Sequence, residues 1–528
     1  MIATQSLRAP QQDETLLAEP PLSAVPRLLD DNRRRLERLP IRLLGRPLAE
    51  LRAEASEQAR AAAVDYLRQA GEAVPAYAAP PILLAGHQPE LFHPGVWIKN
   101  FALHALARRH GLTPINLVVD NDTVKAAAVR VPAYGADGAR LATVPFDIYQ
   151  GEVPYEERTV QDEALFGSFA ERAGELLRPW DYPSLLPAFW NEVQRQAGRT
   201  ALLGERFAAA RRTVERRWGC QNLELPVSRL CGIEPFAWFA CQLLADLQRF
   251  HLVYNTTVQD HRRSHGIRSK NHPVADLTAD GDWREAPFWA WRAGQTQRGR
   301  PLARLRDGRI ELRIGQDSWP SLPWPDDPHA TVAAWRALEA QGYKLRPRAL
   351  TMTMFTRLVL GDLFIHGIGG GKYDELTDEI VRRYWQCESP RFMVLSATLH
   401  LPLPAANVKQ EQRLQAARQV RDLHWNPQRH LNAIDLPSPS DVQTLMARTA
   451  VGERPETKAE RRRWFQELRG YTERLRPFVR DQSERAAARL ATIDRELAEA
   501  QVTQRRDYAF CLFPEKKLRD AFGRLLGE

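Results

Sequence analysis

The sequence predicts an α/β protein with a parallel-sheet core, and three observations support this fold class. Residues 82–119 follow the order strand, loop, helix, strand, and residues 363–385 repeat the order strand, glycine loop, helix. Beyond Pro404 the chain changes to long, strongly charged helical stretches. A strand–helix–strand unit joins parallel neighbours. With 528 residues, 44% of them hydrophobic, the chain can bury a large core and exceeds the usual length of one domain.

The first part of the chain is predicted to be helical. Residues 28–71 are rich in Arg, Leu, Glu and Ala, and the proline-rich stretch 74–81 ends the helices. We therefore expect an N-terminal helical appendage over residues 1–78.

The predicted core covers residues 79–400, with insertions at about 151–345. Residues 82–85 form a short apolar run typical of a buried strand, and residues 115–119 have the β-branched content of a parallel strand. Between them lies a helical pattern that basic residues and Gly111 end. A further helix is expected over residues 236–250. Residues 363–365 predict another strand, 366–372 a glycine loop and 374–385 a helix.

Residues 401–528 are predicted to form a helical hairpin or coiled-coil arm. The helical stretches carry apolar residues at intervals that suit a packed seam, and three residues should interrupt a continuous rod. The apolar positions are Leu468, Leu475, Leu490, Ile493 and Leu497, and the interruptions are Pro455, Gly470 and Pro477.

Composition excludes several classes of protein. The five cysteines form no CxxC pair and no Cys/His cluster at zinc spacing, so neither a disulfide framework nor a metal site is predicted. The N-terminal residues lack the order of a secretory signal, and no apolar run approaches the roughly 18 residues of a membrane span. We therefore expect a cytoplasmic protein with no membrane partner. The net charge of +9 is mild for this length, and no nucleic-acid-binding motif accompanies it.

The segment 86–95, GHQPELFHPG, joins a predicted strand to a predicted helix, where free backbone N–H groups and the helix dipole favour an anion. His87 and His93 can donate hydrogen bonds to phosphate, and Lys99 lies one turn into the helix. Gly86, Gln88 and Gly95 complete the predicted cofactor-binding loop. A glycine turn with core histidines explains the same residues about equally well.

The segment 366–374, HGIGGGKYD, has the same setting and contains four glycines and a lysine. It matches neither the Walker A pattern nor G-x-G-x-x-G. Four glycines carry an entropic penalty that a merely structural turn seldom needs, which favours an anion-binding loop. The residues predicted here are Lys372 as a catalytic group, His366, Gly367, Gly369, Gly370 and Gly371 as cofactor-binding groups, and Tyr373 and Asp374 as substrate-binding groups.

Two other polar clusters are candidates. Asp120, Asn121 and Asp122 follow the second strand at the edge where open α/β sheets bind ligands, although Asp and Asn are also common turn residues. Asp120 is predicted to be catalytic and Asp122 to bind substrate. The cluster 260–269, DHRRSHGIRS, could supply cations to phosphate, and an exposed basic helix explains it nearly as well. No Gly-x-Ser-x-Gly or HExxH motif supports hydrolase chemistry.

The order of three motifs resembles the bacillithiol-synthesis cysteine-adding enzyme family. The motifs are GHQPELFHPGVWIKNFAL, INLVVDND and RPRALTMTMFTRLVLGDLFIHGIGGGKYDELTD. Gly86, Gln88, Leu91, Phe92 and Gly95 match the first family loop, and Arg348, Leu350, Gly367 and Gly369 match the late one. The sequence departs from the family where Gly370 to Asp374 replace a Pro-x-Glu pattern and where Asn121 interrupts the acidic strand end.

The resemblance implies a Rossmann-like core, a C-terminal coiled coil that forms homodimers, and a ligase that joins an amino acid, with cysteine as one candidate, to a small acceptor by an amide bond. Amide formation requires activation, for which ATP or another nucleotide is the candidate cofactor; the magnesium requirement is left open. In this interpretation His93, Lys372 and Asp120 carry the chemistry, and Arg348 binds substrate. The alternative is a catalytically altered homologue that acts as a nucleotide-binding scaffold or dimerisation protein.

Overall fold

The computed structural model describes residues 7–77, 81–136, 138–272, 274–324, 326–404, 408–431 and 457–528. The chain divides into two compact units. Unit 1 comprises residues 1–131, 142–401 and 506–528, and unit 2 comprises residues 132–141 and 402–505. The candidate site lies wholly in unit 1.

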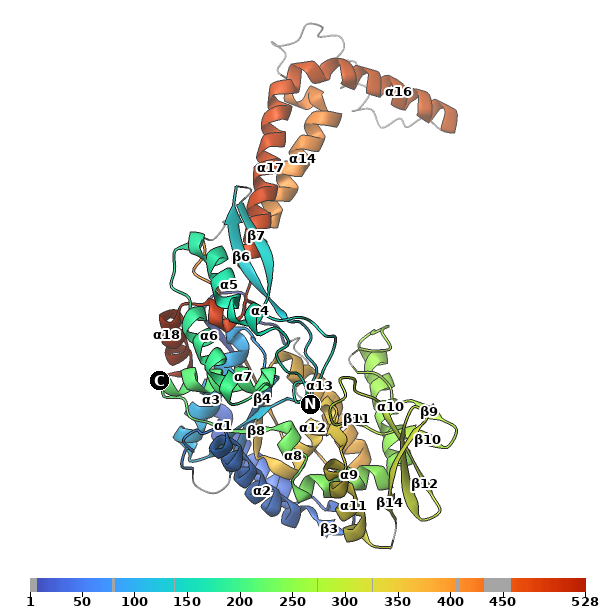
Figure 1. Ribbon diagram of the computed structural model, residues 1–528. Coiled ribbons are helices and arrows are strands. Elements are labelled where there is room, and N and C mark those ends of the chain that lie inside the picture. The colour runs from blue at the N-terminus through green and yellow to red at the C-terminus, as the bar shows by residue number, and fades with distance from the viewer. Residues whose placement is uncertain are drawn as a thin grey trace. The chain divides into compact units, whose positions relative to one another are not determined.

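A six-stranded sheet forms the centre of unit 1 (Figure 1). Five neighbouring strands are parallel, and β1 pairs antiparallel with β17 at one edge. The predicted α/β class is therefore confirmed, with a mixed sheet in place of a purely parallel one. The strand order is β1 (Thr15–Glu19), β17 (Met393–Thr398), β16 (Leu363–His366), β4 (Ile82–His87), β5 (Thr113–Val118) and β8 (Leu223–Pro226).

The strand–helix–strand unit predicted near residue 82 is confirmed as β4, α3 (Pro94–His110) and β5. Pro94 occupies the first turn of α3, where its fixed φ and missing N–H cost nothing. Gly111 ends the helix with a φ of 66°, a left-handed conformation that glycine adopts without steric penalty. The strands β4 and β16 are direct parallel neighbours, so the segments that follow them leave the sheet at the same edge.

The predicted helices near the N-terminus are present as α1 (Val25–Glu37) and α2 (Leu48–Gln69). Small residues along one face of α2, including Ala55, Ala59 and Ala63, are fully buried, and the helix packs against β8 in the same apolar core as the central sheet.

The helix expected over residues 236–250 is two helices, α9 (Glu234–Ala245) and α10 (Leu247–Ser264). Asp246, at φ −113° and ψ 32°, breaks the helical geometry between them. The helices that precede them are α4 (Glu163–Gly167), α5 (Phe169–Leu177), α6 (Leu186–Arg195), α7 (Leu203–Arg217) and α8 (Val227–Leu230).

A second, antiparallel sheet lies within the region predicted as insertions. Its order is β14 (Asp317–Pro323), β13 (Arg309–Ile314), β12 (Pro301–Arg306), β10 (Trp283–Glu285) and β9 (Ala279–Asp280). The other elements here are the pair β11 (Phe288–Arg292) and β15 (Tyr343–Pro347), with α11 (Pro328–Ala340) and α12 (Ala349–Phe355).

The glycine loop predicted over residues 366–372 is wrong in its extent, because α13 (Ile368–Trp385) begins six residues before the predicted helix start at residue 374. Gly369, Gly370 and Gly371 therefore lie in the first turns of a helix. Glycine has poor helix propensity, which made the segment resemble a loop. Close packing explains the last of them, because a Cβ at Gly371 would lie 2.4 Å from Val394 Cγ2.

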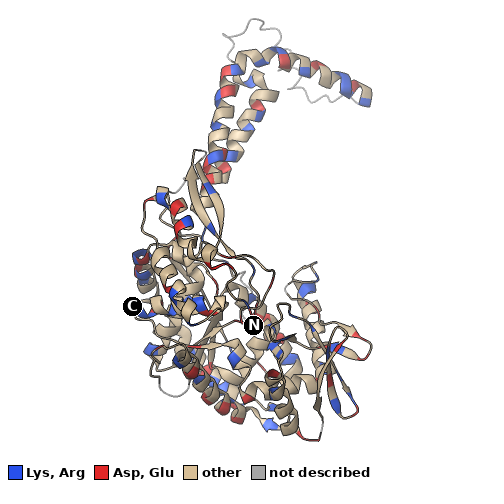
Figure 2. Ribbon diagram, viewed as in Figure 1, with Lys and Arg blue, Asp and Glu red and all other residues tan. Residues whose placement is uncertain are grey.

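Three helices of unit 2 are described: α14 (Gln410–Trp425), α16 (Lys458–Leu475) and α17 (Arg480–Thr503). The expected long C-terminal helices are thus present, and α14 packs against α17. Lys and Arg are interspersed with Asp and Glu along them (Figure 2). Pro477 separates α16 from α17 as expected, but Gly470 lies inside α16 without interrupting it. Pro455 lies outside the described residues.

The described residues also form the hairpins β2 (Arg42–Leu43) with β3 (Arg46–Pro47) and β6 (Ala128–Gly135) with β7 (Gly138–Pro145), the helix α18 (Glu515–Leu526) and several short 3-10 or π-helical turns. No helix within the described ranges combines the length and apolar character needed to cross a bilayer.

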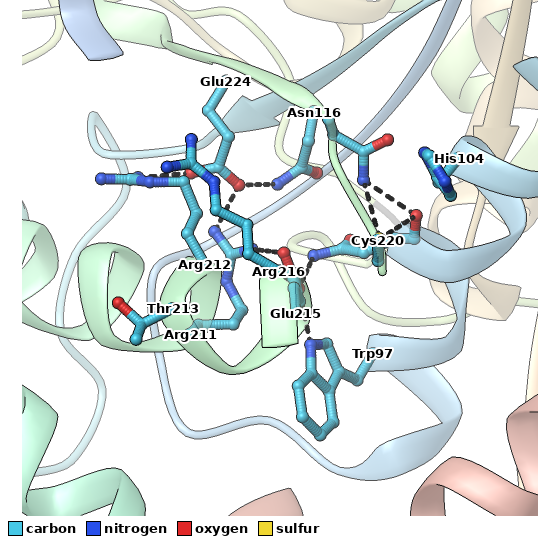
Figure 3. Close-up of polar contacts among 12 residues, drawn as sticks. Trp97, His104, Asn116, Arg211, Arg212, Thr213, Glu215, Arg216, Cys220 and Glu224 are labelled. Atoms are coloured by element: carbon cyan, nitrogen blue, oxygen red, sulfur yellow. Dashed lines mark hydrogen bonds and ion pairs between the residues drawn. The ribbon is translucent and has the colours of Figure 1, made fainter. Parts of the chain in front are cut away.

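A buried network of charged side chains joins α7 to the central sheet (Figure 3). The carboxylate of Glu224 on β8 lies 2.6 Å from the Arg212 guanidinium and accepts a 2.6 Å hydrogen bond from Asn116 on β5. Arg211 contacts both Glu224 and Glu215. Burial alone would raise the Glu224 pKa, but the charges of Arg211 and Arg212 outweigh it and hold that pKa below its usual range.

Candidate functional site

The two predicted loop segments line one cleft of about 920 Å³ at the carboxyl ends of β4 and β16. We call this cavity the main cleft. Most of the predicted site residues line it: Gly86, His87, Gln88, His93, Gly95, Asp122, Arg348, His366, Gly367, Gly369, Gly370, Lys372, Tyr373 and Asp374. Asp120 and Gly371 are not among its lining residues.

The N-termini of two long helices contribute to the cleft. His93 is the N-cap residue of α3, and Gly367 is the N-cap residue of α13. Neither N-terminus is capped by a side-chain hydrogen bond. The first backbone N–H groups of α13 therefore retain their capacity to bind an acceptor. At α3, Pro94 has no N–H and Val96 donates its N–H to the His93 carbonyl, so that helix contributes chiefly its dipole; both dipoles favour negative charge at the cleft.

Lys99 is a buried cation without a carboxylate partner among the described residues. The residue is 3% exposed, and its Nζ donates a 3.0 Å hydrogen bond to the carbonyl oxygen of Gly86. A Cβ at Gly367 would lie 3.9 Å from the same Nζ, which places the ammonium beside the start of α13. Burial lowers the Lys99 pKa to about 8. Buried charges in proteins are normally paired with an opposite charge. The Lys99 ammonium departs from this rule, which indicates a place for an anionic ligand.

The two histidines of the first segment are neutral at pH 7. Burial lowers the His87 pKa to about 3, and the nearby Lys99 charge adds to that shift. Burial also lowers the His93 pKa to about 4, and the charges of Arg506 and Lys99 add to that shift. The Nδ1 atom of His93 is buried and makes no hydrogen bond within the described structure. These rings can donate hydrogen bonds to a bound anion, while Lys99 and, beside His93, the Arg506 guanidinium supply positive charge on this side of the cleft.

Asp374 and His366 form a buried pair beside the start of α13. The His366 Nε2 atom lies 2.7 Å from the Asp374 carboxylate, and Arg357 contacts the same carboxylate at 2.7 Å. Burial alone would raise the Asp374 pKa, but Arg357 and His366 outweigh it and hold that pKa well below its usual range. The Asp374 carboxylate is thus neutralised by the protein, whereas neighbouring Lys372 is exposed at the cleft.

Two arginines lie close to one aromatic ring in the main cleft. The guanidinium carbons of Arg298 and Arg348 lie 4.4 and 4.6 Å from the centre of the Trp289 ring. Arg298 also contacts Asp122 at 3.2 Å, and the Gln88 amide donates to Asp122 at 2.8 Å.

Arg348 contacts the buried carboxylate of Glu285, so each guanidinium already has a carboxylate partner. The remaining N–H groups of guanidinium groups held in this way suit recognition of a further carboxylate or phosphate. Arg348 and Asp122 were predicted from the sequence, whereas Arg298 and Trp289 carry no local signal and were not.

Asp120 lies apart from the other predicted catalytic residues. It lines a different cavity, of about 750 Å³, and its carboxylate accepts hydrogen bonds from the backbone N–H and the hydroxyl of Ser228. Burial, together with the charge of Glu156, raises the Asp120 pKa to about 7. The structure therefore does not bring Asp120 together with His93 and Lys372.

Gly95 and Gly369 are each the second residue of a helix that begins at the cleft, but their surroundings differ. A Cβ at Gly95 would lie 2.0 Å from the carbonyl oxygen of Ala397, whereas a Cβ at Gly369 would meet no atom within 4 Å. Gly95 thus allows α3 to approach β17, and Gly369 faces open space.

We predict that Gly95→Ala lowers the free energy of unfolding by about 1–3 kcal/mol or more, because the clash is with backbone. Gly369→Ala should range from neutral to a gain of about 1 kcal/mol, because alanine is the better helix former. Chemical denaturation of both variants checks this contrast. Equal stabilities would contradict the close packing of α3.

No protein-family model matches this chain, and a search of curated proteins finds no match either. The assignment of function therefore depends on the geometry of the main cleft and on the resemblance described above.

Proposed function

We propose that the main cleft binds a small anionic molecule and that the protein is a ligase-like enzyme that joins an amino acid, with cysteine as one candidate, to a small acceptor. The proposal depends chiefly on the buried, unpaired ammonium of Lys99 beside the N-termini of α3 and α13. A phosphate or carboxylate at this position would supply the missing counter-ion and would accept hydrogen bonds from the first backbone N–H groups of α13.

The reaction class comes from the family resemblance, and the cleft is consistent with it. Amide formation requires an activated carboxyl group, and ATP or another nucleotide is the proposed activator. Its phosphates would lie near Lys99 and the start of α13, with Lys372 at the exposed side. Arg298 and Arg348 would hold the carboxylate of the second reactant. In this account the core is a Rossmann-like nucleotide-binding fold, and the C-terminal helices form a homodimer.

The main experiment is a comparison of small thiols and amines in cell extracts with and without the gene by mass spectrometry. The expected result is the loss of one thiol conjugate and the accumulation of its amine precursor. Purified protein incubated with ATP, cysteine and the precursor should restore the conjugate. Unchanged metabolites would contradict the ligase assignment, whereas anion binding by the purified protein would remain separately measurable.

Anion binding should depend on pH through Lys99. Because its pKa is lowered to about 8, the ammonium is charged below pH 8 and loses its proton above it. A ligand that binds only the charged form should therefore lose affinity by up to about tenfold per pH unit above pH 8. Calorimetric titration with ADP, and with sulfate as an anion that does not titrate in this range, checks the prediction between pH 7 and 10. A flat profile for both ligands would contradict it.

A further inference from the structure

Three side chains outside the proposed anion site form a compact group of metal-ligand type. His261 lies near the end of α10, His265 caps that helix, and Glu375 lies on α13. Their ligand atoms all lie within 4.8 Å of one another. His261 and His265 are four residues apart and therefore share one face of the helix, and their rings stack with centroids 4.1 Å apart.

Ion pairs and hydrogen bonds fix the two helices around this group. Arg383 on α13 contacts Asp260 on α10 at 2.8 Å, directly beside His261. Arg262 holds the segment after α10 in place, because its guanidinium donates a 3.0 Å hydrogen bond to the carbonyl oxygen of His272 and contacts Asp276 at 2.9 Å. The group thus spans two helices whose separation is already set.

The orientation of His265 suits coordination. Its Nδ1 atom lies 2.9 Å from the carbonyl oxygen of His261, which can only accept a hydrogen bond. The Ser264 hydroxyl lies 3.0 Å from the same Nδ1 and can donate to it, whereas in the tautomer that carries the proton on Nδ1 the lone pair of Nε2 is available for a metal. A hydrogen bond from the second ring nitrogen to a backbone carbonyl is the usual way in which proteins orient a metal-binding histidine.

We propose that His261, His265 and Glu375 bind a divalent transition-metal ion of the zinc class. Two imidazoles and one carboxylate are ligands that Zn²⁺ accepts, with a fourth position open to water, whereas Mg²⁺ prefers oxygen ligands alone. Ligand atoms around a tetrahedral zinc ion lie roughly 3.3 Å apart, given bonds of about 2.0–2.1 Å. Separations of at most 4.8 Å reach this value by small side-chain rotations.

The ion would lie at the edge of the main cleft. Glu375 directly follows Tyr373 and Asp374, which line that cleft, and the Tyr373 ring lies 6.3 Å from the His272 ring. A bound ion would connect the end of α10 to α13 and hold this wall in place. The metal site is independent of the anion proposed above, because none of its three ligands contributes to the binding of that anion.

The test is metal binding by the tag-free, full-length protein after removal of metal with a chelator. Calorimetric titration with Zn²⁺ should show one site per chain, and Co²⁺ should give the visible absorption of a tetrahedral complex with mixed nitrogen and oxygen ligands. His261→Ala, His265→Ala and Glu375→Gln should each weaken Zn²⁺ binding by more than the roughly 10–100-fold that loss of an outer-shell partner causes.

His251→Ala is the matched control, because His251 lies on the same helix outside the group. It should bind Zn²⁺ as the wild type does. Thermal melts of the metal-free variants should coincide with that of the wild type, since the His265 side chain is exposed and the others are partly so. Zn²⁺ binding that survives all three substitutions, or that His251→Ala abolishes, would overturn the proposal.

Discussion

Replacing Lys99 by methionine is expected to weaken anion binding by at least about 30-fold while making the free protein more stable. The loss of affinity follows because a buried charge paired with a ligand contributes about 2–5 kcal/mol to binding. Stability should rise because the folded state holds an uncompensated ammonium. The Lys99 pKa of about 8 lies below the unfolded value of about 10.4, so the cost is present in full below pH 8 and disappears as the pH rises through 10.4.

At pH 7 that cost amounts to about 3 kcal/mol, which sets the scale of the gain expected in Lys99→Met. Calorimetric titration with ADP and urea denaturation at pH 7 measure the two effects. Lys516→Met is the control: its side chain is 85% exposed on α18, and both quantities should remain unchanged. A Lys99→Met protein that binds ADP normally would contradict an anion at this position. A Lys99→Met protein that is less stable than the wild type would contradict the destabilising effect of the buried ammonium.

Glu224→Gln should lower the free energy of unfolding by about 3–5 kcal/mol, the usual cost of breaking a buried ion pair from one side. The Glu224 side chain is 1% exposed and contacts two arginines that are themselves buried (Figure 3). The amide would leave Arg211 and Arg212 with one negative charge fewer in a region that water does not reach.

The matched control is Glu152→Gln, which removes a carboxylate from an exposed pair with Lys125 in which the two side chains are 57% and 59% exposed. Such pairs contribute at most about 1 kcal/mol. Urea denaturation of the two variants side by side gives the comparison. Similar losses in both proteins would show that the network around Glu224 does not depend on its charge.

The parts of the fold that the sequence predicted well are those with strong local signals. These signals act within a few residues. They are the apolar run of β4, the proline and glycine at the two ends of α3, and the β-branched run of β5. The mixed direction of the sheet was not predictable in this way, because β1 and β17 pair across most of the length of the chain.

The residues of the main cleft could be predicted from the sequence mainly where they directly follow a predicted strand, as the segments after β4 and β16 do. Asp120 and Asp122 are two residues apart, yet Asp120 bonds Ser228 and Asp122 bonds Gln88 and Arg298. Those partners lie far away in the sequence, so no local pattern separates the two carboxylates. Arg348, which contacts Trp289 together with Arg298, is likewise far from that ring in the sequence. The four-residue spacing of His261 and His265 was a visible signal, but its third member, Glu375, comes from another helix.

The chain leaves unit 1 after Leu401 and returns at Arg506. Arg506 donates a 3.1 Å hydrogen bond to the carbonyl oxygen of Ala397, so the points of departure and return are neighbours. A premature stop codon near residue 405 would therefore delete more than the long helices. It would also remove Arg506, whose guanidinium lines the main cleft, and Phe510 and Phe522, whose rings pack against Trp97. To learn what the long helices contribute, an engineer should excise residues 402–505 and join the two cut ends with a short glycine–serine bridge.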